Sequence, residues 1–174
     1  MMNPRFHAIC FLLPIGFAFV ASIEAQGQIQ FVDGTATRFP VQAEYTNQIA
    51  VADIDADGDL DMCFANGQGY STLGTLLKPR IYINSGVGVF SDQTDTRVAG
   101  ITGCFRSAEF GDVDSDGDVD LLLGQDYSRQ MLLLINNGAG VFANETTVRI
   151  PTLNTSTARA TFGDVDADGD LDIA

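Results

Sequence analysis

The feature that most constrains this chain is an acidic phrase of ten residues that occurs three times. The copies read ADIDADGDLD, GDVDSDGDVD and GDVDADGDLD, and their first aspartates lie 59 and 52 residues apart. They hold 15 of the 23 acidic residues: Asp53, Asp55, Asp57, Asp59, Asp61, Asp112, Asp114, Asp116, Asp118, Asp120, Asp164, Asp166, Asp168, Asp170 and Asp172. The remaining acids nearly balance the nine Lys and Arg residues, so the formal net charge of −14 belongs to three sites rather than to a general acidic surface.

Two further phrases recur in step with the acidic one. "NSGVGVF" from Asn84 and "NNGAGVF" from Asn136 each begin 28 residues before the first aspartate of the next acidic phrase. "FVDGTATRFP", "FSDQTDTRVA" and "FANETTVRIP" begin at Phe31, Phe90 and Phe142, each 22 residues before such a first aspartate. Three signals on a common period near 50 residues predict a repeat architecture.

Each period contains four short apolar segments. In the second copy these are RSAEFGDV, VDLLLG, MLLLIN and VFANET, and the Asn-Gly turn in NNGAG is typical of a hairpin. After residue 25 no segment shows a convincing helical period. The pattern predicts an all-β fold, an incomplete β-propeller of four-stranded antiparallel blades with about two and a half blades present.

The repeats also set the expected domain boundaries. Residues 26–174 form the propeller segment, with an N-terminal strand at 26–44, the first blade at 45–95, the second at 104–147 and the start of a third at 157–174. We interpret the chain as part of a longer product. The strand Ile29 to Thr35 is then expected to join a distant last blade and latch the ring.

The N-terminus is typical of a targeting segment. An apolar run from Ala8 to Val20 follows one arginine, and a cleavage position lies after Ala25. The run is shorter than the roughly 20 residues that a membrane-spanning helix needs. Residues 1–25 are therefore predicted to be a signal peptide. The product is expected to be secreted, extracellular or on the cell surface, with the periplasm as an alternative and no membrane span after cleavage.

Two cysteines remain after that cleavage, Cys63 and Cys104. In an oxidising compartment they can form a disulfide bond. The alternative is that both are small buried apolar residues. The sequence leaves the two alternatives open.

The spacing D-x-D-x-D-G-x-x-D indicates a metal loop. It places carboxylates at positions 1, 3, 5 and 9, a glycine at position 6 for a sharp turn, and a backbone carbonyl at position 7. Crowded oxygen donors suit Ca²⁺ better than Mg²⁺, and no loop offers the His or Cys that favours zinc. An EF-hand is excluded because position 12 is Phe64 or Leu123 and the flanks are strand-like. We predict up to three Ca²⁺ ions.

With these phrases together, the sequence resembles the FG-GAP or VCBS-type repeats of bacterial secreted proteins and, more distantly, of integrin α-subunit propellers. The matching residues are Phe110-Gly111, Phe162-Gly163, the acidic loops and "INNGAGVFANET" with its relative "INSGVGVFSDQT". The resemblance implies a β-propeller with Ca²⁺ in the loop between the first two strands of a blade. Two departures are Val51-Ala52 in place of Phe-Gly and the absence of the integrin Gly-Ala-Pro element.

The expected function is that of a non-catalytic calcium-binding scaffold that recognises an extracellular protein or carbohydrate. Residues after 25 include no histidine, the acids outside the loops are scattered, and no nucleic-acid partner is expected. The alternatives are the propeller portion of a larger secreted enzyme or a purely structural surface protein. Residues 67–78 are either a contact surface or a neutral insertion. The repeated Arg38, Arg97 and Arg149 are expected to pair with local acids or carbonyls rather than to form a ligand-facing ring.

Overall fold

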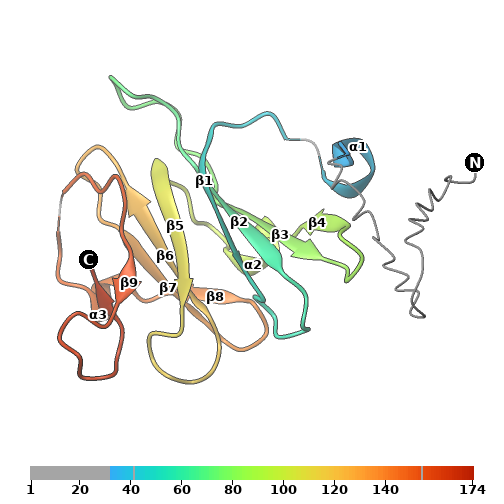
Figure 1. Cartoon of the computed structure of the whole chain (residues 1–174). Helices are drawn as coiled ribbons and strands as arrows, with labels where there is room; N and C mark the ends of the chain where they lie inside the picture. Colours follow the sequence, from blue (N-terminus) through green and yellow to red (C-terminus); the bar gives the residue numbers. More distant parts are fainter. Residues whose placement is uncertain (1–31, 41, 154) are drawn as a thin grey trace, which may run out of the picture. The chain divides into compact units, whose positions relative to one another are not determined.

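The computed structural model describes residues 32–40, 42–153 and 155–174, and Asp33–Ala174 forms one compact unit. Figure 1 shows this unit as a series of antiparallel sheets. The predicted signal peptide and residues 29–31 of the predicted latch strand lie outside the described residues. The described remainder, 32–35, has no strand, and a single helical turn begins at Thr35. Within these residues, no helix is both long enough and apolar enough to cross a lipid bilayer.

Two four-stranded sheets and one two-stranded sheet follow one another along the chain. Strands β1 (Thr46–Ala52), β2 (Asp61–Asn66), β3 (Arg80–Asn84) and β4 (Phe90–Asp92) form the first sheet. Strands β5 (Phe105–Gly111), β6 (Asp120–Gln125), β7 (Leu132–Asn136) and β8 (Phe142–Asn144) form the second, and β9 (Phe162–Gly163) pairs with β10 (Asp172–Ile173) in the third. The all-β prediction of an incomplete propeller is confirmed: the sheets are antiparallel, with neighbours in sequence order, and do not close into a ring.

Both complete blades use the same strand register. Ala52 pairs with Asp61 in the first, and Gly111 pairs with Asp120 in the second. The departure Val51-Ala52 therefore leaves the pairing of β1 unchanged. In the described chain Val51 is 50% exposed, whereas Phe110 packs against the core at the junction with the first blade.

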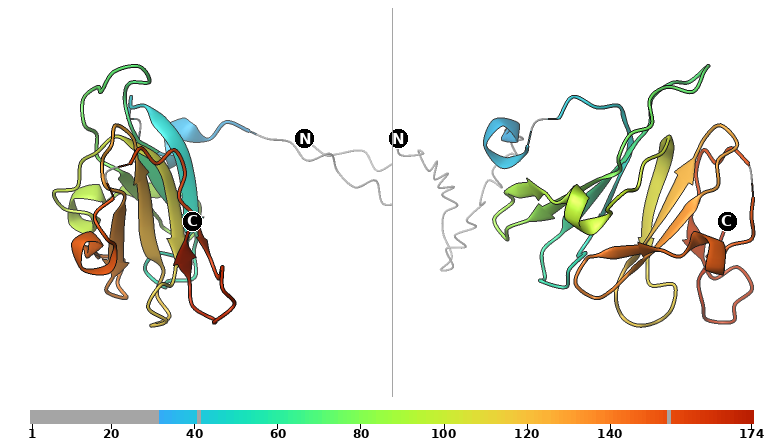
Figure 2. Two further views of the ribbon diagram at one scale, coloured as in Figure 1. Left: turned by 90° about the vertical axis from the view of Figure 1, so that its left-hand side faces the viewer. Right: turned by 180° about the vertical axis from the view of Figure 1, so that it is seen from behind.

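The sequence shows no helical period after residue 25, yet the structure contains three single helical turns. Single-turn helices α1 (Thr35–Arg38), α2 (Thr94–Arg97) and α3 (Thr146–Arg149) occupy the recurring Thr-x-x-Arg phrase. Four residues are too few for a helical period to appear in the sequence. α2 and α3 follow directly on the fourth strands and lie on the side of the sheets that faces the viewer in the right-hand view of Figure 2.

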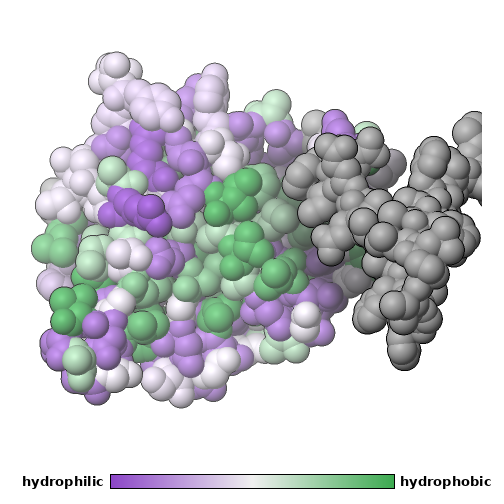
Figure 3. Space-filling model, in the orientation of Figure 1, coloured by the Kyte–Doolittle hydropathy of each residue, from purple (hydrophilic) through white to green (hydrophobic). Residues whose placement is uncertain are grey.

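The core lies within the blades and at the junction between them. Its buried members are Ile54, Cys63, Ala65, Ile81, Ile83, Val98, Phe105, Ala108, Leu121, Leu123, Leu134 and Phe142. Leu121, Leu122 and Leu123 are all at most 1% exposed, so β6 is covered on both faces, as its unbroken apolar run predicts. On the face drawn in Figure 3, apolar residues gather over β1, where Ile49 and Val51 are about half exposed.

A β-bulge at the start of β1 and of β5 turns a polar side chain across the blade junction. Asn47 and Arg106 are the unpaired residues in the two bulges. Asn47 Nδ2 donates to the carbonyl of Phe105 at 2.8 Å, and Arg106 Nη1 donates to Asn47 Oδ1 at 3.3 Å. Neighbouring blades are therefore joined by hydrogen bonds as well as by apolar packing.

Both cysteines of the described chain are buried free thiols, and no disulfide joins them. Cys63 lies in the centre of β2, and Cys104 Sγ donates to the carbonyl of Gln68 at 3.4 Å. Burial raises the pKa of both thiols. The structure therefore corresponds to the second of the two alternatives, in which they act as small apolar residues.

Candidate metal centre

The three acidic loops occupy one end of the blades. They connect β1 to β2, β5 to β6 and β9 to β10. The β3–β4 and β7–β8 turns lie at the same end because the strands are antiparallel, and residues 67–78 lie at the opposite end. Figures 1 and 2 show the acidic loops along one edge in every view, away from the loop 67–78.

The backbone of each loop follows one path, with positions numbered from 1 at the first aspartate to 9 at the last. The glycine at position 6 has a φ of +92° in Gly58, +96° in Gly117 and +99° in Gly169. A Cβ at these glycines would meet nothing within 4 Å, so glycine is required by the backbone conformation and not by space. Position 4 is also left-handed, in Ala56, Ser115 and Ala167.

The aspartate at position 1 holds the turn closed. Asp53 accepts hydrogen bonds from the amides of Asp57 at 3.1 Å and Gly58 at 3.0 Å. The second and third loops repeat this pair with distances between 3.0 and 3.2 Å. The loops are thus shaped by their own backbone amides.

The aspartate at position 9 is a buried structural anchor in both complete blades. Asp61 is 0% exposed and accepts hydrogen bonds from the amides of Ile54 at 3.0 Å and Asn84 at 2.7 Å. Asp120 makes the corresponding bonds to Val113 and Asn136. Burial raises the pKa of each carboxyl group, and the two backbone hydrogen bonds oppose that rise.

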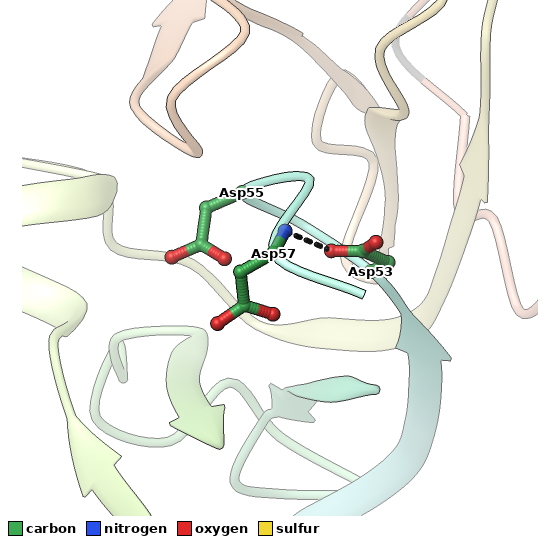
Figure 4. Close-up of side chains that lie close together, drawn as sticks. All are labelled: Asp53, Asp55 and Asp57. Atoms are coloured by element: carbon green, nitrogen blue, oxygen red, sulfur yellow. Dashed lines mark hydrogen bonds between the residues drawn. The ribbon is translucent and has the colours of Figure 1, made fainter. Parts of the chain in front are cut away.

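Carboxylates from each loop converge closely enough to share one cation. In each of the following groups, one carboxylate oxygen per residue lies within 4.8 Å of the others: Asp53, Asp55 and Asp57; Asp112, Asp114 and Asp120; Asp164, Asp166 and Asp172. Figure 4 shows the first group, with the carboxylates of Asp55 and Asp57 extending to the same side of the loop. Positions 1 and 3 therefore belong to all three groups.

The aspartates at position 7 point elsewhere. Oδ2 of Asp59 lies 2.7 Å from the place where a Cβ on Gly86 would stand, and Oδ2 of Asp118 lies 2.6 Å from that place on Gly138. These side chains lie against the β3–β4 and β7–β8 turns instead of among the converging carboxylates. This agrees with a loop in which position 7 offers its backbone carbonyl.

The donor set fits a hard divalent cation. Asp55 Oδ1 is buried and has no hydrogen-bond partner among the described residues. A buried carboxylate oxygen without a partner is costly unless a cation or a donor satisfies it. The convergent ligands are all oxygens, the type that Ca²⁺ and Mg²⁺ prefer.

The recurring arginines contact these loops. Arg97 Nη2 lies 2.8 Å from Asp55 Oδ2, and Arg149 Nη2 lies 3.0 Å from Asp114 Oδ2. Arg97 also donates to the carbonyl of Ala139 in the next blade, and Arg38 donates to the carbonyl of Val87 at 2.9 Å. Pairing with a local acid is therefore confirmed for Arg97 and Arg149, whereas the carbonyl partners of Arg38 and Arg97 belong to the following blade and are not local.

Sequence reasoning missed the part played by the turn asparagines. Asn136 Nδ2 donates to the carbonyl of Ile54, 82 residues earlier, at 2.9 Å, and to that of Val119 at 3.1 Å. Its Oδ1 accepts from the amides of Gly138 and Gly140. The constant spacing of 28 residues between this asparagine and the first aspartate of the next acidic phrase was the sequence feature that could have indicated this role.

Comparison with known families agrees with this geometry. A family model described as FG-GAP-like repeat matches residues 53–123 and again residues 112–174. The chain belongs to the FG-GAP-like repeat family. The two matches cover more than half of the chain, and each begins at the first aspartate of an acidic loop. A search of curated proteins found no match.

The Phe-Gly pair of this FG-GAP-like repeat has a packing role at the blade junction. A Cβ on Gly111 would lie 2.7 Å from Cδ2 of Phe162, the phenylalanine of the next repeat. The glycine therefore makes room for the ring of the following blade.

Proposed function

We propose that the chain is a secreted, non-catalytic scaffold that binds Ca²⁺ in its acidic loops and recognises an extracellular protein or carbohydrate. The observation that carries the proposal is the convergence of three carboxylates in each loop, with Asp55 Oδ1 buried and unpartnered. Ca²⁺ suits these loops better than Mg²⁺ because it accepts irregular oxygen sets. The N-terminal apolar run and the repeat family support an extracellular location.

Bound Ca²⁺ would neutralise aspartates that otherwise repel one another, and so join the first two strands of each blade. The residues expected to hold it are the aspartates at positions 1, 3, 5 and 9, with the carbonyl of position 7. We assign a non-catalytic scaffold for two reasons. The clustered carboxylates are the proposed metal ligands, and the sequence has no histidine after His7. The propeller portion of a larger secreted enzyme remains the alternative function.

Calorimetric titration of the 174-residue chain with CaCl₂ tests the metal proposal. We expect uptake of three ions with dissociation constants on the order of millimolar or tighter, as in extracellular modules, and weaker uptake of Mg²⁺. Each single substitution Asp55→Asn, Asp114→Asn or Asp166→Asn should remove one ion.

Asp95→Asn is the matched control, because it removes one exposed acid outside the loops and should leave the stoichiometry unchanged. Parent protein that takes up no Ca²⁺ at millimolar concentration would refute the metal proposal. An equal loss in the Asp95→Asn variant would show that uptake reflects general charge and not the loops.

A further inference from the structure

The second blade contains an open cavity at the end opposite the acidic loops. Its volume is about 380 Å³, and its lining includes Ile101, Thr102, Gln125, Arg129, Leu132 and Asn144. This volume lies in the range of small-molecule sites, roughly 300–1,000 Å³. None of these residues belongs to the metal loops, so the cavity is separate from the candidate metal centre.

In the first blade, charged side chains fill the position that corresponds to this cavity. By strand register and the repeat period, its Arg80, Asn66 and Asp92 correspond to Leu132, Gln125 and Asn144. Arg80 forms ion pairs with Glu44 and, at 3.2 Å, with Asp92, and Asn66 Nδ2 donates to Glu44 Oε2 at 2.7 Å. The hydrogen bond with Glu44 raises the pKa of Arg80 above its ordinary value.

The second blade lacks the charged residues that form this ion-pair cluster. Leu132 and Asn144 are uncharged, and Gly103 stands where the first blade has Glu44. A Cβ on Gly103 would lie 2.3 Å from Oε1 of Gln125 and 2.5 Å from the ring of Phe105. Gln125 and Phe105 therefore occupy the place beside Gly103, and the second blade has no acid there that could pair with a cation.

Arg129 places a positive charge in the lining of the second-blade cavity. Among the described lining residues it is the only charged side chain, and its Nε is buried without a hydrogen-bond partner in the described part of the chain. The cations Lys78, Arg80, Arg97, Arg106 and Arg149 all form ion pairs. The planar guanidinium group binds a carboxylate through two parallel N–H groups.

We propose that this cavity binds a carboxylate-bearing sugar, such as a hexuronic acid unit of an acidic polysaccharide. Arg129 would hold the carboxylate, while the Thr102 hydroxyl and the Asn144 amide, which line the same cavity, would hydrogen-bond ring hydroxyls. One cation and several hydrogen-bonding side chains around a cavity of this size suit a small polar ring that carries a carboxylate. The inference rests on the proposed recognition role and gives it a site and a ligand class.

Calorimetry with galacturonic acid trimer tests the inference, using its fully methyl-esterified form as the neutral counterpart. In about 0.15 M salt, which screens long-range charge, we expect one trimer to bind per chain. The ester should bind at least about tenfold more weakly, because it cannot form charge-assisted hydrogen bonds with Arg129. Arg129→Gln should cause a similar loss.

Arg159→Gln is the matched control, since Arg159 is exposed, lies outside the cavity lining and carries the same charge. It should bind the trimer like the parent protein. A second variant, Leu132→Arg with Asn144→Asp, introduces the charged pair of the first blade into the cavity and should also abolish binding.

Ca²⁺ uptake by the same samples separates the two proposals. Normal uptake without trimer binding overturns the cavity inference and leaves the metal scaffold standing. Equal binding of acid and ester, or unchanged binding by Arg129→Gln, also overturns it. Binding of a glutamate-rich peptide in place of the trimer would show that the site takes protein carboxylates and that the sugar class is wrong.

Discussion

At the residue scale, the asparagine at the start of the β3–β4 turn and of the β7–β8 turn forms hydrogen bonds with several backbone groups. Asn136 is 4% exposed and its side chain bonds four of them, including the carbonyl of Ile54 in the preceding blade. Asn84 makes the same two bonds to its own turn, and its Nδ2 donates only to Leu60, at 3.2 Å. The two asparagines differ because only Asn136 has a preceding blade within the described chain.

Asn136→Ala should therefore destabilise the protein more than Asn84→Ala. The first substitution leaves buried carbonyls and amides unpaired, and we expect a loss of about 3 kcal/mol in the free energy of unfolding. For Asn84→Ala we expect about 1 to 2 kcal/mol, because its groups are nearer to solvent. Urea unfolding in the presence of a chelator measures both without a metal contribution. Equal losses would contradict the role of the bond to Ile54.

At the element scale, the single-turn helices α2 and α3 each carry an arginine that reaches the acidic loop of their own blade. Arg97 and Asp55 are only 11% and 18% exposed in their side chains, and Arg97 also holds the β7–β8 turn through Ala139. Arg149 pairs with Asp114 and, within its helix, with Glu145. Only the arginine of α2 therefore ties two blades together in the described chain.

We expect Arg97→Gln to lower the free energy of unfolding by about 1 to 2 kcal/mol, because it removes a partly buried charge pair and an interblade hydrogen bond. Arg149→Gln is the matched substitution and should cost less, since its more exposed pair makes no such bond. Thermal unfolding of the two variants side by side checks the order. A larger loss for Arg149→Gln would show that α2 does not act as a blade connector.

The loop 67–78 is also fixed by the neighbouring blade. Leu77 and Gly103 exchange backbone hydrogen bonds of 2.9 Å, and Arg106 lies 4.6 Å from the centre of the Tyr70 ring. The loop is thus part of the blade junction, while Tyr70 stays 83% exposed.

At the scale of the whole molecule, the three loops differ in how firmly position 9 is held. In the first two, a third strand donates an amide to Asp61 or Asp120. Asp172 accepts from Val165 at 3.0 Å, and its sheet has two described strands. The same contrast appears at position 2, where Ile54 is 1% exposed and Val165 is 71% exposed.

The third loop should therefore bind Ca²⁺ more weakly than the other two, by about tenfold or more, because its ligand must lose more conformational freedom. Pairwise combinations of Asp55→Asn, Asp114→Asn and Asp166→Asn leave one loop intact at a time. Titration of each double variant gives the three separate affinities. A third loop as tight as the others would show that the acidic phrase alone sets the affinity.

Much of this protein is determined by its sequence alone. The acidic phrase, the turn phrase and their common period predict the antiparallel blades, and the glycine at position 6 predicts the sharp turn of each loop. These features are local: strand alternation, a left-handed glycine and hydrogen bonds within a few residues decide them. The Thr-x-x-Arg phrase was visible too, although one helical turn is too short to show a period.

Only the tertiary structure decided which side chains meet across blades. Arg97 reaches Ala139, Asn136 reaches Ile54, and Cys63 and Cys104 stay apart as buried thiols. The cavity at Arg129 also depends on what surrounds it, since Gly103 and Leu132 replace an ion pair that the first blade keeps. Such contacts follow from how two similar sheets pack and differ between copies of one repeat, and no local pattern in the sequence specifies them.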